Sequence, residues 1–95
     1  MVKLEKELER TLIRSVESRG GKCLKWVSPG TTGLPDRIIL LPKGRIIFVE
    51  MKRPKGSQVG ALQCYWRQKI RELGFLHWWV YTEADIEALF DHVEV

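Results

Sequence analysis

Two short apolar runs separated by a three-residue turn constrain the fold of this chain more than any other feature. Residues 36–41 and 45–52 are rich in Ile, Leu, Val and Phe, and Pro42-Lys43-Gly44 lies between them. Runs of this composition on either side of a short turn are typical of an antiparallel hairpin. We therefore expect two adjacent strands joined by a tight turn.

The length of that turn decides which side chains share a face of the sheet. With a three-residue turn that ends in a left-handed Gly44, Leu41 pairs with Arg45. Counting back along both strands then places Asp36 opposite Glu50, with their Cβ atoms about 5 Å apart on one face. A two-residue turn would place them on opposite faces. We predict the three-residue turn and two facing carboxylates.

Facing carboxylates limit what this part of the chain can do. Two such groups repel, and both stay ionised at neutral pH only when a cation lies between them. Converging carboxylates suit a hard cation, and Lys52, on the same face as Glu50, suits an anionic substrate such as a phosphodiester. The alternative is a strand-end Asp36 and an edge-strand Glu–Lys pair that point into solvent.

Helical and strand-like patterns on either side of the hairpin complete the predicted fold. They mark helices over residues 3–18, 59–73 and 83–90, and strands over residues 22–28 and 75–81. Gly20-Gly21 and Gly74 end the first two helices. A helix between the last two strands implies that these strands are parallel. We expect an α+β fold of order α-β-β-β-α-β-α, with a mixed sheet flanked by helices.

Size and composition bound the remaining possibilities. The chain has 95 residues, 44% of them hydrophobic, and a net charge of +4. We expect one domain over residues 1–95 with a thin core, for which a second copy is a plausible partner. Its basic surface permits a nucleic-acid partner without demonstrating one. Two distant cysteines give neither a zinc finger nor a disulfide framework. No apolar run reaches membrane-spanning length, and the charged amphipathic start does not resemble a signal peptide, so we expect an intracellular, cytoplasmic protein.

Two polar residues lie among apolar ones on the predicted helices. Glu9 falls inside the apolar arc of the first helix, which is formed by Leu4, Leu8, Leu12, Ile13 and Val16. A buried glutamate is costly unless it is paired or binds a cation, although at the edge of the arc it could reach water. Gln63 flanks the apolar stripe of the second helix, which is formed by Val59, Leu62, Trp66, Ile70 and Leu73. A glutamine there is more often a structural hydrogen-bonding group than a site residue.

Taken together and in order, these residues resemble the VRR-NUC domain, a branch of the PD-(D/E)xK nuclease superfamily. The matching segments are Glu9, Lys25-Trp26-Val27-Ser28-Pro29-Gly30, Gly33-Leu34-Pro35-Asp36, Glu50-Met51-Lys52, Gln63 and Gly74-Phe75. The resemblance covers residues 4 to about 82 and implies a restriction-endonuclease-like core. It further implies cleavage of DNA that depends on Mg²⁺ or Mn²⁺.

The resemblance assigns a role to each site residue. It implies that Asp36 and Glu50 bind the metal, that the Met51 carbonyl is a further ligand, and that Glu9 contributes directly or through a water. Lys52 would orient or help deprotonate the attacking water, and Gln63 would position Lys52 or that water. The residues expected to contact DNA are Arg53, Lys55, Lys25 and Arg67.

The resemblance also implies a kind of substrate and an assembly. Small members of the family resemble enzymes that resolve Holliday junctions as homodimers, so branched DNA and a homodimer are expected. A flap nuclease, a general DNA nuclease and a DNA-binding module without catalytic activity stay open as alternatives.

Overall fold

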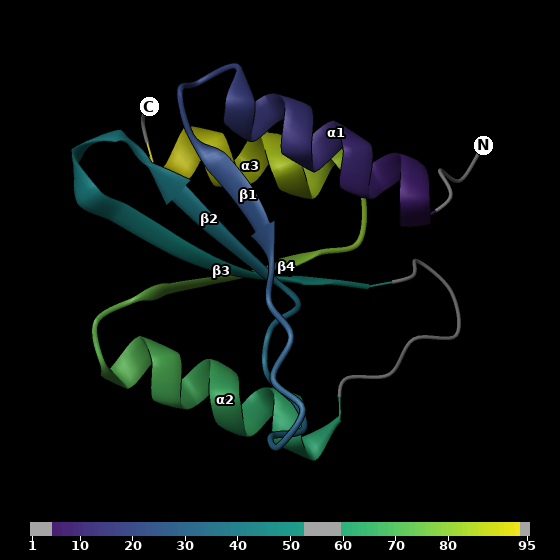
Figure 1. Ribbon diagram of the computed structural model, residues 1–95, viewed down its shortest axis with the longest axis vertical. Helices are drawn as coiled ribbons and strands as arrows, with labels where there is room; N and C mark the ends of the chain where they lie inside the picture. The colour runs from purple at the N-terminus through teal and green to yellow at the C-terminus, as the bar shows by residue number, and fades with distance from the viewer. Residues whose placement is uncertain (1–4, 53–59, 94–95) are drawn as a thin grey trace.

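The computed structural model describes residues 5–52 and 60–93. Its elements are α1 (Glu5–Glu17), β1 (Lys22–Lys25), β2 (Arg37–Leu41), the short 3₁₀ turn η1 (Pro42–Gly44), β3 (Arg45–Met51), α2 (Ala61–Glu72), β4 (Leu76–Val80) and α3 (Glu83–Val93). The predicted order of helices and strands is confirmed. Figure 1 shows three layers, with α1 and α3 on one side of the sheet and α2 on the other. None of the described helices is long and apolar enough to cross a bilayer.

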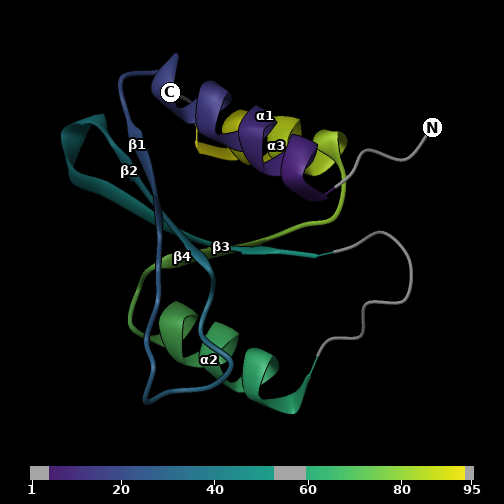
Figure 2. The same cartoon turned by 45° about the vertical axis from the view of Figure 1, so that its right-hand side comes forward.

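The sheet is mixed, as predicted, with the strand order β1-β2-β3-β4. Strands β1, β2 and β3 are antiparallel neighbours, and β3 pairs with β4 in parallel through the α2 crossover. Strand β1 ends at Lys25, three residues earlier than expected, although the Trp26 N–H still donates to the Asp36 carbonyl at 2.9 Å. Beyond this bond the chain leaves the sheet and runs beside the start of α2 (Figure 2).

The hairpin register agrees with the prediction. Leu41 pairs with Arg45 and Arg37 with Val49, so one further step places Asp36 opposite Glu50. The turn has left-handed backbone at two successive positions, Lys43 with φ 70° and Gly44 with φ 72°. Glycine adopts this conformation without strain, which explains Gly44, whereas the left-handed Lys43 was not expected.

The core lies between the sheet and the α1–α3 layer. Strand side chains that point to this side pack against one face of each helix: Ile39, Leu41, Ile47, Val49, Met51 and Val80 meet Leu8, Leu12, Val16, Ile86, Leu89 and Phe90. Full burial of a side chain of this size stabilises a fold by about 1.5–3 kcal/mol. Because strand side chains alternate, the other face of the sheet is left to Glu50 and its neighbours.

Helix α2 buries only part of the apolar stripe that its sequence suggests. Ile70 is buried, but Leu62 and Leu73 are 52% and 74% exposed, and Val59 lies outside the described residues. The helix instead turns the flank that carries Gln63 toward the sheet. Two hydrogen bonds between Gln63 and the side chains of β3 and the residue after it, described below, account for this orientation.

Candidate active site

The candidate site lies where β3 ends, β2 begins and α2 begins. Glu50 lies near the end of β3, and its side chain points toward α2 and is only 7% exposed. Asp36 immediately precedes β2, opposite Glu50. Lys52 directly follows β3, and its backbone N–H still donates to the Val80 carbonyl of β4 at 2.8 Å. The parallel β3–β4 pair therefore fixes the backbone that carries both the acid and the amine.

Gln63 forms hydrogen bonds with both the Glu50 carboxyl and the Lys52 amine. Its Oε1 accepts a hydrogen bond from Lys52 Nζ at 2.5 Å, and its Nε2 donates to Glu50 Oε1 at 2.8 Å. The same Oε1 accepts the backbone N–H of Gly60, the N-cap of α2, at 3.1 Å. The amide oxygen accepts from two donors and the amide nitrogen donates to one acceptor, so only one orientation of the amide group satisfies all three hydrogen bonds. The start of α2 is thereby tied to Glu50 and Lys52.

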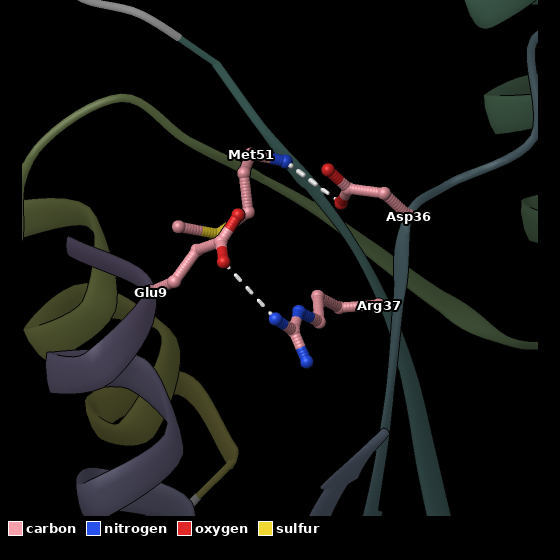
Figure 3. Close-up of polar contacts among 4 residues, drawn as sticks. All are labelled: Glu9, Asp36, Arg37 and Met51. Carbon is pink, nitrogen blue, oxygen red and sulfur yellow. Dashed lines mark hydrogen bonds and ion pairs between the residues drawn. The ribbon is translucent and has the colours of Figure 1, made fainter. Parts of the chain in front are cut away.

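Asp36 is held against the end of β3. Its Oδ1 accepts the Met51 N–H at 3.1 Å (Figure 3). Burial raises the pKa of the Asp36 carboxyl above its usual value; the Met51 hydrogen bond opposes this shift, and the nearby Glu9 charge adds to it. The N–H and C=O of one strand residue leave the strand on the same side, so the Met51 carbonyl also faces the side of Asp36.

The environment of Glu50 disfavours its charge. Burial, and then the charge of Asp36, raise the pKa of the Glu50 carboxyl to about 7, while the Lys52 charge and the Gln63 hydrogen bond act in the opposite direction. The second carboxyl oxygen, Oε2, is buried without a hydrogen-bond partner among the described residues. A buried oxygen in this state needs a proton or a cation.

Glu9 reaches the same region from the other side of the sheet. It projects from α1, and Arg37 Nη2 donates to Glu9 Oε2 at 3.1 Å in a half-buried ion pair (Figure 3). This pair explains how Glu9 is tolerated among the apolar residues of α1. Arg37 was not predicted as the partner of Glu9, and the only signal for it is its position next to Asp36, where strand alternation turns it toward α1.

The oxygen atoms of the site suit a hard divalent cation, although they do not form a preformed coordination site. In the described part of the chain, no three His, Cys, Asp or Glu side chains are grouped so that they could hold a metal ion. Oxygen ligands are nevertheless what Mg²⁺ and Mn²⁺ prefer, and Mg²⁺ commonly uses only one or two carboxylates. Asp36, the Met51 carbonyl and the unpartnered oxygen of Glu50 fit that chemistry.

The residues expected to contact DNA are less concentrated. Lys25 is exposed at the end of β1, and Arg67 lies on α2 one turn beyond Gln63, half-buried. Arg53 and Lys55 fall outside the described residues. Trp79, which was not expected at the site, is the β4 neighbour of Glu50 and shares its face of the sheet.

Comparison with known proteins agrees with the geometry. No family model matches the chain. Over 50 residues the chain is 50% identical to "Putative nuclease p44" of Acyrthosiphon pisum secondary endosymbiont phage 1; this segment is 53% of the chain and 54% of that relative, so the chain matches about half the length of the relative. A solved structure described as a VRR_NUC domain is 26% identical and superposes with a TM-score of 0.85, over 93% of this chain and 95% of the other. The chain therefore has the fold of this VRR_NUC domain over nearly the full length of both, as the resemblance predicted.

Proposed function

We propose that the chain is a metal-dependent DNA endonuclease that hydrolyses phosphodiester bonds. The observation that carries this proposal is the buried Glu50, bridged by Gln63 to Lys52 and facing Asp36. This arrangement places carboxylate oxygens that can bind a cation next to the Lys52 amine, which can bind an anionic substrate. The similarity to a phage protein named as a nuclease supports the same activity.

The acidic side of the site would hold the metal. Asp36, Glu50 and the Met51 carbonyl are the expected ligands of Mg²⁺ or Mn²⁺, and Glu9 lies close enough to influence the charge of Asp36. Such an ion, when bound, offsets charge on the phosphate and lowers the pKa of a water molecule. The Glu50 carboxyl must lose its proton to serve as a ligand, so the site should load with metal more readily as the pH rises past about 7.

Lys52 and Gln63 would act on the substrate side. Lys52 lies near the Glu50 carboxylate and donates to the Gln63 amide oxygen, so its amino group is held in one place. In that place it stabilises the negative charge that develops on the attacked phosphate and orients the attacking water. Gln63 is a positioning residue, because it restrains Lys52 and Glu50 together.

We further propose a homodimer that acts on branched DNA such as a Holliday junction. A two-fold dimer presents two active sites to the two strands that must be cut. The face of the sheet that carries Glu50 is only partly covered by α2, and it exposes the large apolar side chains Leu24, Leu40, Ile46 and Phe75. Exposed apolar residues that share a face support an interface between two copies.

Cleavage of a panel of labelled DNAs tests this proposal. Four-way junction, flap, nicked and linear duplexes are incubated with Mg²⁺ or Mn²⁺, and the mass in solution is measured in parallel. We expect metal-dependent cuts, strongest in the junction, by a particle of twice the chain mass. Lys52→Ala should lose cleavage, whereas Lys69→Ala, which changes an exposed lysine on α2, should cut like the wild type. If none of the DNAs is cut, the nuclease proposal is wrong and a DNA-binding module without catalytic activity is favoured. If all of them are cut equally, the proposed preference for junctions is wrong.

A further inference from the structure

Two buried nitrogen atoms between α2 and β4 lack hydrogen-bond partners among the described residues. They are Nε of Arg67 and Nδ1 of His77, and His77 is only 2% exposed. A buried polar group without a partner costs about 1–3 kcal/mol, so such groups are uncommon in folded proteins. Two of them near each other, outside the candidate active site, indicate that a ligand completes this region.

The same region carries positive charge along one flank of α2. Gln63, Arg67 and Arg71 follow one another at intervals of four residues, so the two arginines lie about 6 and 12 Å beyond Gln63 along the helix. His77 lies on β4, two residues before the Trp79 that neighbours Glu50. Arg67 and Arg71 on α2 and His77 on β4 therefore all lie on the same side of the candidate active site, at increasing distance from Gln63 and Trp79.

Two hollows open the region to solvent, and Arg71 lines both. One of about 470 Å³ is lined by Cys64, Arg67, Gln68, Arg71 and Glu72, and one of about 260 Å³ by Arg71, His77, Trp78, Trp79 and Asp85. The two acids have other partners: Asp85 Oδ2 accepts the N–H groups of Tyr81 and Thr82, and Glu72 pairs with Lys69. In the described part of the chain, no carboxylate forms an ion pair with either arginine.

Electrostatics favours an anion at this place. Burial, and then the charges of Arg67 and Arg71, lower the pKa of His77 to about 4. The imidazole is therefore neutral at neutral pH, and the two guanidinium groups supply the charge. Arginine is well suited to phosphate, because its planar group donates two parallel hydrogen bonds.

A second arginine pair shows that spacing alone does not make such a site. Arg10 and Arg14 have the same four-residue spacing on α1, and with Ile13 they line a hollow of about 370 Å³. Both arginines are exposed, and among the described residues that line this hollow no buried side-chain nitrogen or oxygen lacks a partner. The pair on α1 is therefore a matched control for the pair on α2.

We propose that Arg67, Arg71 and His77 bind a backbone phosphate of the DNA strand that occupies the active site. This inference rests on the proposed function. The two helical turns from Gln63 to Arg71 correspond to roughly three nucleotides of a duplex strand. The contact would hold the strand in register with Glu50 and Lys52.

Titration with inorganic phosphate tests the site without DNA, metal or cleavage. The chain has two histidines, His77 and His92, so their ring resonances can be followed separately by NMR. We expect a saturable shift of the His77 resonances that is lost in Arg71→Gln and kept in Asp36→Asn. A shift of His77 no larger than that of His92, or an equal shift in Arg71→Gln, would overturn the proposal. Because Asp36→Asn disables the candidate active site, this result is independent of whether the protein cuts DNA.

The salt dependence of DNA binding tests whether the phosphate belongs to the substrate. We expect Arg67→Gln/Arg71→Gln to reduce the slope of log affinity against log salt by about 1, whereas Arg10→Gln/Arg14→Gln leaves the slope unchanged. The exposed Arg71→Gln alone serves if the half-buried Arg67 is needed for folding. An equal change in slope for both double variants, or no change in either, would contradict a specific phosphate contact on α2.

Discussion

Replacing Glu50 by glutamine should stabilise the metal-free protein above neutral pH. The Glu50 carboxyl is 7% exposed, faces Asp36, and has one oxygen without a partner in the described part of the chain. Its folded-state pKa is raised to about 7, mainly by burial. Glutamine keeps the shape and can still accept the Gln63 hydrogen bond, but it carries no charge.

The size of the effect follows from that pKa. In the unfolded chain the carboxyl returns to its ordinary pKa of 4.5. Between pH 4.5 and about 7 the folded protein therefore holds a proton that the unfolded chain has released, so the free energy of unfolding falls as the pH rises. At about 1.4 kcal/mol for each pKa unit, wild type loses about 3 kcal/mol across this window. The Glu50→Gln variant does not lose this stability, and its higher free energy of unfolding at pH 8 corresponds to a Tm about 10–20 °C above that of wild type.

Urea denaturation at pH 5 and pH 8 in EDTA, followed by circular dichroism, measures the difference. The Glu50→Gln variant should gain stability over wild type at pH 8 and little at pH 5. Glu72→Gln, an exposed change on α2, should differ from wild type by less than about 0.5 kcal/mol at both pH values. Added Mn²⁺ should stabilise wild type at pH 8 and stabilise the Glu50→Gln variant much less.

Two results would refute this reasoning. An advantage of Glu50→Gln that is the same at pH 5 and pH 8 would show that the charge of Glu50 is not disfavoured by the fold. A loss of stability at pH 8 would show that the carboxylate makes favourable contacts that the structure does not contain.

Three further predictions follow from the contacts around the site. Gly33→Ala should destabilise the fold by about 2–4 kcal/mol in urea denaturation, because a Cβ there would lie 2.6 Å from the Leu62 Cβ and φ is +93°; an unchanged midpoint would contradict this packing. Gln63→Leu removes the bridge between the acid and the amine, and single-turnover cleavage should slow by about 10–100-fold, so a wild-type rate would remove its positioning role. Glu9→Gln leaves the half-buried Arg37 without its ion pair and should cost about 1 kcal/mol in the same denaturation assay, whereas a stabilised variant would show that the pair is unfavourable.

The fold was largely predictable because its main constraints are local. A three-residue turn fixes the pairing of Leu41 with Arg45, and a helix between two strands makes them parallel. The orientation of α2 was not predictable from its apolar stripe. Leu62 and Leu73 stay largely exposed, whereas polar contacts that no hydrophobic pattern encodes hold the flank that carries Gln63 against the sheet.

The candidate site was predictable to different degrees. That Asp36 faces Glu50 follows from counting residues along the hairpin, and the register agrees. The partner of Glu9 could not be found in this way, because Arg37 is 28 residues away and the contact depends on how α1 packs on the sheet. The position of Gln63 was suggested by its place on the helix flank, but its two bonds depend on the crossover that brings α2 to β3.

The most direct test of the central claim is single-turnover cleavage of a labelled four-way junction by the wild type and by Asp36→Asn in Mn²⁺. The variant keeps the size of the side chain and can still accept the Met51 hydrogen bond, so its fold should be retained. We predict that wild type cuts in Mn²⁺ and not in EDTA, and that Asp36→Asn leaves the DNA as intact as in the protein-free control. Cleavage by Asp36→Asn at the wild-type rate, or by wild type in EDTA, would contradict a metal-dependent site formed by Asp36 and Glu50 at the ends of strands β2 and β3.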